Sequence, residues 1–242
     1  MTLEEAAQLS SIIFGEAFEG EDLSDFPLYE VRFNGCVFRN CIFDTNRFGG
    51  SHFINCRFTH CSFRDAEFKE CTFYDAEGAK GSEWAFCDLS HTRFVKCDLG
   101  ANKITKSKGF LLELTDCSAV EMHLDLEVHR RVVQRNVIGG IRCFKTKMQG
   151  SILRKCDWEE SRFEQCDLRE ADFSHSRLTG VSFLNSSLNN ASFDEAILNE
   201  ATIAHAGIEG LDLNLTRSYD NLIVSRDQHD AILNNFSIRT AN

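Results

Sequence analysis

Apolar and polar residues recur along this chain with a period of five. Between Val31 and Phe73 every fifth residue is a phenylalanine, in one unbroken register: Phe33, Phe38, Phe43, Phe48, Phe53, Phe58, Phe63, Phe68 and Phe73. A small residue such as Cys36 or Ser51 stands two positions before most of them. A period of five is neither the 3.6 of a helix nor the 2 of a strand, and a fixed period indicates a repeat architecture. The pattern therefore predicts a thin solenoid, with a bulky side chain on the axis and a small one closing the wall.

The period is interrupted twice. The segment 75–81 carries one extra residue, after which the apolar positions resume out of phase at Trp84. Fourteen residues separate Leu124 from Ile138, one fewer than three pentads, and a second regular run then extends from Met148 to Leu213. Extra residues between two in-register runs must leave the wall as a bulge or loop. We therefore expect excursions near residues 75–81 and 125–137, within a solenoid that spans 23–213.

Both ends depart from the period. Thr2 and Glu5 have the spacing of a capping box, and Glu16 and Glu21 occupy places where a small inward residue is expected, so residues 1–22 are predicted to form a helical cap. In the tail, 214–242, Ser225 and Gln228 fit a helix start. Its apolar residues suit either a plain cap or a two-fold interface. The predicted dimer interface consists of Leu222, Ile223, Ile232, Leu233, Phe236 and Ile238.

Composition excludes several classes of protein. Ten of the eleven cysteines, all except Cys143, take the small inward position, so a ladder of buried free thiols is expected and neither disulfides nor zinc. No apolar run is long enough to cross a bilayer, and the N-terminus lacks a secretion signal, which predicts a cytoplasmic protein without membrane contact. The eight histidines are scattered, and no phosphate-binding or nucleophile motif is present. We therefore predict no enzyme, no catalytic residue, no cofactor and no metal.

The repeat resembles the pentapeptide-repeat family, and its interruptions are similar to those of the quinolone-resistance (Qnr) members. The resemblance lies in residues 73–81, in Cys97-Asp-Leu99, in the run 151–163 and in the tail residues Gln228, Ala231, Ile232, Leu233, Phe236 and Ile238. It implies an all-β solenoid in the form of a right-handed quadrilateral β-helix, with short N-terminal and C-terminal helical caps. It also implies a homodimer that binds DNA gyrase or topoisomerase IV and protects it from quinolones. The residues before 23 and the arginine-rich second excursion depart from the family pattern.

The charged residues are distributed unevenly along the chain, which affects the expected binding to a topoisomerase. The net charge is −11, yet residues 101–150 carry 9 basic against 5 acidic side chains, whereas 151–200 carry 10 acidic against 5 basic. An acidic rod suits a basic, DNA-binding saddle and argues against direct binding of nucleic acid. The alternatives are an acidic surface of no special purpose, or a pentapeptide-repeat scaffold or immunity protein with a different protein partner.

The predicted partner-binding residues lie on the excursions and on the acidic run. Projecting loops on a rigid scaffold make distinctive contacts, whereas regular coils present repetitive surfaces. The competing interpretation is that both excursions are passive insertions. The candidates are Asp75, Glu77 and Lys80 in the first excursion, Arg130, Arg131, Gln134 and Arg135 in the second, and Glu159, Glu164 and Asp167 in the acidic run.

Overall fold

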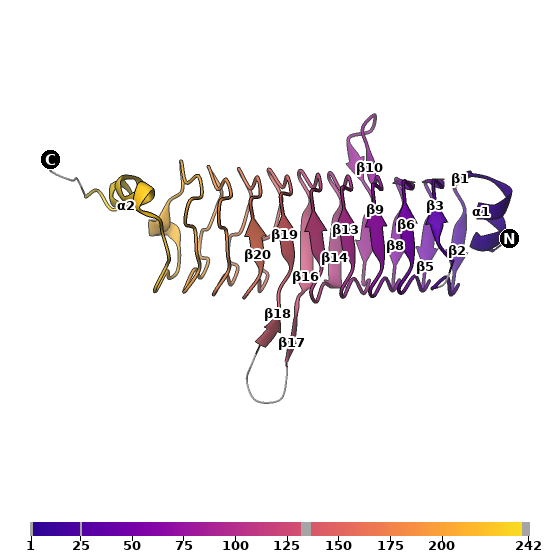
Figure 1. The fold of residues 1–242 in the computed structure, drawn as a ribbon, viewed down its shortest axis with the longest axis horizontal. Coiled ribbons are helices and arrows are strands. Elements are labelled where there is room, and N and C mark those ends of the chain that lie inside the picture. The colour runs from indigo at the N-terminus through magenta and orange to yellow at the C-terminus, as the bar shows by residue number, and fades with distance from the viewer. Residues whose placement is uncertain (1, 25, 132–136, 239–242) are drawn as a thin grey trace.

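The computed structural model is a straight parallel β-solenoid with one short helix at each end (Figure 1). It describes residues 2–24, 26–131 and 137–238. Successive coils pair residues twenty positions apart, as in Phe33↔Phe53, so four pentads complete one turn. The predicted fold class is confirmed.

The four pentads of each coil form four faces, which we call A to D in chain order. Face C consists mainly of single parallel bridges, such as Asp22↔Ile42 and Ile42↔Ser62. Face A holds β1 (Ile12–Phe14), β4 (Arg32–Asn34) and β7 (His52–Ile54). Face B holds β2 (Ala17–Glu19), β5 (Val37–Arg39), β8 (Arg57–Thr59), β12 (Glu83–Ala85), β14 (Lys103–Lys108) and β16 (His123–Glu127). Face D holds β3 (Leu28–Tyr29), β6 (Arg47–Gly49), β9 (Glu67–Lys69), β13 (Arg93–Val95), β15 (Glu113–Thr115), β19 (Arg142–Phe144) and β20 (Arg162–Glu164).

The core is a column of stacked rings enclosed by small side chains. Phe53 stacks on Phe33 at 5.1 Å and on Phe73 at 5.0 Å between ring centroids, and all three are buried. The cysteines at the small position are buried as predicted, except for the half-buried Cys156, and they donate to main-chain carbonyls, as Cys61 does to Phe38 at 3.4 Å. Corner residues such as Asn40 (φ 52°) adopt left-handed backbone, which favours Gly, Asn and other polar residues there.

The N-terminal cap is shorter than predicted. Helix α1 spans Leu3–Leu9, with the expected Thr2–Glu5 capping box, and the solenoid already begins at β1, which pairs with β4. The predicted cap extends to residue 22 because Glu16 and Glu21 stand where small inward residues are expected. Glu16 is exposed instead, and the Glu21 carboxylate accepts a hydrogen bond from the Leu3 N–H at 2.8 Å.

The solenoid also continues beyond residue 213, where the prediction ended it. Ser218 and Ile223 pair in parallel with Ile197 and Thr202, each 21 residues earlier, so a single extra residue hid the repeat. The end is closed by the 3₁₀ turns η1 (Leu213–Leu215) and η2 (Arg226–Gln228) and by helix α2 (His229–Asn235). The predicted Ser225–Gln228 capping box is present, and the Gln228 amide donates to the carbonyls of Ile203 and Ala206, both at 2.8 Å. No helix in the described part of the chain has the length and apolarity needed to cross a membrane.

Candidate partner-binding surface

The first excursion is a β-hairpin at the corner between faces A and B. Strands β10 (Tyr74–Asp75) and β11 (Lys80–Gly81) pair antiparallel, and the hairpin projects from the rod in Figure 1. Thr72 pairs with Asp98, 26 positions later, so the coil contains six additional residues and not the one that the sequence predicts. Phase in a period of five does not distinguish an insertion of one from an insertion of six.

Asp75 organises the turn of this hairpin. Its carboxylate accepts from the Asn55 amide at 2.9 Å and from the Glu77 main-chain N–H at 3.1 Å. The hydrogen bond from Asn55 lowers the pKa of Asp75, with support from the main-chain N–H of Gly78. At the base, a Cβ on Gly81 would lie 2.3 Å from the main-chain nitrogen of Asn102, so the hairpin sits directly on the next coil. Glu77 and Lys80 are exposed and therefore offer charge to a partner.

The second excursion is a hairpin at the diagonally opposite corner, between faces C and D. Strands β17 (His129–Arg131) and β18 (Val137–Gly139) pair antiparallel. Leu114 pairs with Cys143, 29 positions later, a net gain of nine residues. The predicted Arg130 and Arg131 lie on β17, whereas Gln134 and Arg135 lie outside the described residues.

The base of the second hairpin is anchored on both sides. The His129 Nε2 atom is 2.8 Å from the carbonyl oxygen of Glu159, one coil onward. Gly140 has φ +87°, and a Cβ there would lie 2.9 Å from the Ser161 main chain, so no larger residue fits without a shift. Val128 is buried beneath the hairpin. These contacts fix the direction in which the hairpin leaves the rod, on the side opposite to the first one (Figure 1).

The predicted acidic patch does not form one surface. Residues five positions apart lie on successive faces, so Glu159, Glu164 and Asp167 are on faces C, D and A. Each also has an internal partner. Arg177 pairs with Glu159 at 3.1 Å, Ser182 donates to Glu164 at 2.8 Å, and Arg169 pairs with Asp167 at 2.6 Å. The hydrogen bond from Arg169 lowers the pKa of Asp167.

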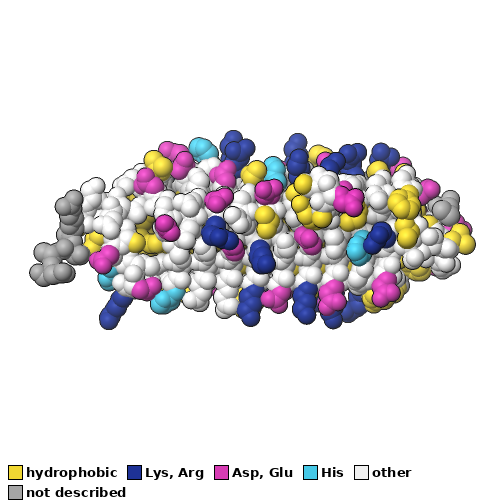
Figure 2. All heavy atoms as spheres, turned by 90° about the horizontal axis from the view of Figure 1, so that it is seen from above, with side chains coloured by type: hydrophobic (Ala, Val, Ile, Leu, Met, Phe, Trp, Pro, Cys, Tyr) yellow, Lys and Arg dark blue, Asp and Glu magenta, His cyan; other side chains and the backbone are white. Residues whose placement is uncertain are grey.

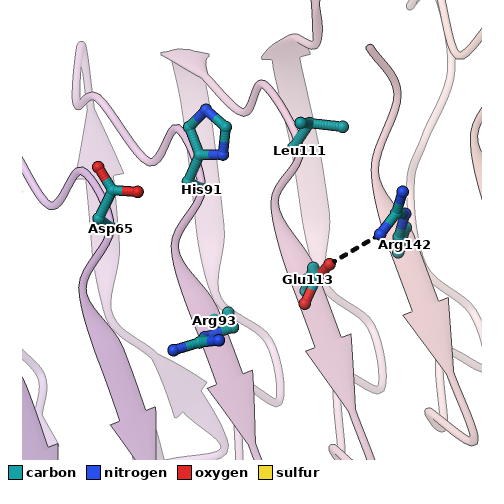
Figure 3. A pocket seen from close by; sticks show the side chains of 6 residues that line it. All are labelled: Asp65, His91, Arg93, Leu111, Glu113 and Arg142. Atoms are coloured by element: carbon teal, nitrogen blue, oxygen red, sulfur yellow. Dashed lines mark hydrogen bonds and ion pairs between the residues drawn. The ribbon is translucent and has the colours of Figure 1, made fainter.

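A ladder of alternating charge runs along face D and was not predicted. The Glu67 carboxylate lies 2.8 Å from Arg93 and 3.9 Å from Arg47, and Glu113 pairs with Arg142 at 3.2 Å. Figure 3 shows the groove beside this ladder, where Asp65, His91 and Leu111 form the opposite wall. The paired residues are 20 positions apart for Arg47 and Glu67, 26 for Glu67 and Arg93, and 29 for Glu113 and Arg142. The ladder therefore has no constant spacing in the sequence, because the two insertions lengthen two of these intervals. Because these charges compensate one another, the groove has no dominant sign.

The predicted interface residues at the C-terminal end divide into two sets. Leu222, Ile232 and Phe236 pack against the core, and the Phe236 ring lies 5.9 Å from that of Tyr219. Leu233 is half-buried, whereas Ile223 and Ile238 are 55% and 51% exposed. The first set therefore serves the cap, and the second leaves apolar surface at this end of the rod.

The described residues include eleven free cysteines, most of them buried. Their pKa values shift in both directions: burial raises the pKa of Cys166 to about 12, which disfavours its reactive thiolate, whereas a hydrogen bond from the Cys61 side chain lowers the pKa of Cys87. Within the described ranges, no group of three or more His, Cys, Asp or Glu side chains is arranged to hold a metal ion.

The four-sided wall, the axial ring column and the small inward residues define a β-solenoid built from five-residue repeats. Comparison of the sequence with known families agrees. The profile described as pentapeptide repeat region matches residues 26–104, and that described as pentapeptide repeats (8 copies) matches 146–183 and 176–214. The chain belongs to the pentapeptide-repeat family.

Solved structures share the fold at low sequence identity. A trypsin-treated form of QnrB1, a plasmid-mediated fluoroquinolone resistance protein, superposes with a TM-score of 0.77 at 15% identity, covering 96% of this chain and 99% of QnrB1. Full-length QnrB1 gives 0.56 at 21% identity over 94% and 100% of the two chains. HetL, a pentapeptide repeat protein involved in heterocyst differentiation regulation in the cyanobacterium Nostoc sp. strain PCC 7120, gives a TM-score of 0.57 at 12% identity over 88% and 86% of the two chains. A search of curated proteins finds no significant match.

Proposed function

We propose that this protein binds a type II topoisomerase, chiefly DNA gyrase, and protects it from fluoroquinolones by contact and not by chemistry. The observation that carries the proposal is the pair of anchored hairpins, which project from diagonally opposite corners of an otherwise uniform rod. The interruptions resemble those of Qnr proteins, and QnrB1 shares the fold. HetL shares it too, so the fold alone does not select this function.

In this proposal the hairpins provide specificity and the rod provides reach. The exposed Glu77 and Lys80 contact the topoisomerase from one corner, and the arginines of the second hairpin contact it from the other, where their planar groups form forked hydrogen bonds with carboxylates. The net charge of −11 favours approach to a basic DNA-binding surface. Charge mimicry of DNA is limited, because Glu159, Glu164 and Asp167 are separated and internally partnered.

The proposal is tested with purified gyrase in a supercoiling assay, with and without a fluoroquinolone, across a titration of this protein. We expect supercoiling to recover as the protein is added. Deletion of residues 76–81 removes the six additional residues and restores the five-residue phase between Phe73 and Ser82. This deletion, or Arg130→Ala with Arg131→Ala, should reduce protection several-fold and leave the melting temperature nearly unchanged.

A matched control is Arg217→Ala, which removes an arginine far from both hairpins and should leave protection intact. Full protection by both hairpin variants would show that the excursions are passive. No effect of the intact protein on gyrase would favour the alternative, a pentapeptide-repeat scaffold or immunity protein for another partner.

A further inference from the structure

An exposed phenylalanine interrupts the polar corner between faces B and C. Phe86 is 49% exposed and has a left-handed backbone, φ 57°, where bulky apolar residues are uncommon. Its N–H is bonded to the Thr105 carbonyl at 3.1 Å, so the regular wall imposes this backbone conformation. The same corner holds Asn40 two coils earlier, which shows that the fold itself does not need an aromatic ring here.

The ring of Phe86 belongs to a flat, positively charged platform. The His60 ring stacks on it in parallel, with centroids 4.9 Å apart and planes 8° apart. On the next coil the Lys106 ammonium lies 5.6 Å from the Phe86 centroid. His60 and Lys106 therefore cover opposite faces of the ring, and its edge is open to solvent. Lys106 is an exposed, flexible side chain, so a planar ligand that displaces its ammonium can stack on the face opposite His60.

Beside this platform lies a groove of about 510 Å³, lined in part by Arg64, Asp88, Lys106 and Lys108. Arg64 is held by Asp44 at 2.6 Å. Among the described residues, neither lysine ammonium forms an ion pair of 4.0 Å or less, so both are available to an anion. The Asp88 carboxylate, which also accepts from the Ser90 N–H, supplies an acceptor in the same groove.

The geometry points to a nucleotide-binding site at this groove, taking a single base with its phosphate. A base takes the place of the Lys106 ammonium on the Phe86 ring, Lys106 and Lys108 neutralise the phosphate, and Asp88 accepts from an amino or hydroxyl group. The volume lies in the range of small-ligand pockets. A mononucleotide fits better than a polymer, because the net charge of −11 repels a polynucleotide. Nucleotide binding here does not depend on topoisomerase binding.

The test is isothermal titration of the full chain with AMP, adenosine, inorganic phosphate and a short single-stranded oligonucleotide. We expect AMP to bind with one-to-one stoichiometry, and adenosine and phosphate to bind at least about tenfold more weakly, since each lacks one of the two contacts. Phe86→Asn uses the residue found at this corner in an earlier coil and should weaken AMP binding about five- to hundredfold. Lys106→Gln should weaken it and reduce its salt dependence.

Phe144→Asn is the matched control, because Phe144 is 37% exposed and lies beneath the Lys145 ammonium at 5.1 Å but is not among the residues that line this groove. Thermal melts establish that each variant is folded. No AMP binding by the native protein overturns the inference, and so does unchanged binding by a folded Phe86→Asn or Lys106→Gln variant. An oligonucleotide that binds more than about tenfold tighter than AMP through the same residues overturns the assignment to a mononucleotide.

Discussion

Phe53 lies between two parallel rings and also meets Phe38, Phe48, Phe58 and Phe68 edge-on at centroid distances of 5.8–6.4 Å. Rigid coils above and below prevent the surroundings from collapsing into a gap. Phe53→Ala should therefore lower the free energy of unfolding by about 3–5 kcal/mol. Phe14→Ala makes the same change at a 64% exposed ring and should have little effect. Chemical denaturation measures both, and equal losses would contradict the axial role of Phe53.

Individual inward residues could be predicted because each pentad repeats one steric requirement. Side-chain partners could not be predicted in the same way. Glu67 and Arg93 are 26 residues apart because the first hairpin intervenes, so their pairing requires knowledge of the insertion's true length. The positions of Glu159, Glu164 and Asp167 on different faces do follow from the period, since residues five apart occupy successive sides. Their proximity in the sequence therefore does not make them one patch.

At the scale of the elements, the first hairpin is stabilised by side-chain hydrogen bonds, whereas the coils are stabilised by main-chain pairing and the buried core. The turn of the first hairpin depends on the ionised Asp75, whose pKa is lowered chiefly by the Asn55 hydrogen bond. A lowered pKa means that the stabilisation is present above the ordinary pKa of aspartate, 3.8, and is lost as the pH falls through the lowered value. We expect Asn55→Ala to raise the pKa of Asp75 toward 3.8. It should also increase amide exchange in residues 76–79.

NMR titration of the Asp75 carboxyl and hydrogen exchange of the hairpin amides measure these changes. Asn40→Ala is a matched control, because Asn40 has the same left-handed corner conformation but lies at the next corner, two coils before the hairpin. An Asp75 pKa that does not change in Asn55→Ala would mean that the main-chain donors alone set it.

The lengths of the elements were the least predictable feature. The sequence places both interruptions correctly. The phase of the apolar positions gives the length of an insertion only up to a multiple of five, so it does not give the full length. The second excursion is preceded by a shift of register. Ser107 on β14 pairs with Leu126 on β16, only 19 residues later, so the coil is one residue short just before the hairpin begins. At the two ends, regular coils are predicted as caps. The causes are Glu21, which stands at an inward position, and the single extra residue before Ser218. Side-chain hydrogen bonds and short bulges absorb such departures without ending the repeat.

At the scale of the whole molecule, charge is distributed by position along the rod more than by face. All lysines lie between Lys69 and Lys155, in the central coils that carry both hairpins and the Phe86 groove. Figure 2 shows acidic and basic side chains interspersed on one long side, without a continuous acidic stripe. The rod therefore presents acidic ends and a mixed centre, which concentrates distinctive contacts at the hairpins.

The C-terminal end is where two such rods would meet if the protein is a dimer, as we predict. Phe236 supports the cap, so its replacement would disturb folding as well as assembly. Ile223 and Ile238 are the better probes, because they are 55% and 51% exposed and have little role inside the protomer. Ile223→Asp with Ile238→Asp should give a folded monomer, since dimerisation would bury unpaired charges in an apolar seam. Leu9→Asp, at the opposite end and 78% exposed, should leave a dimer intact. Sedimentation velocity distinguishes the states. An unchanged dimer in the double variant, or a monomer with Leu9→Asp alone, would place the interface elsewhere.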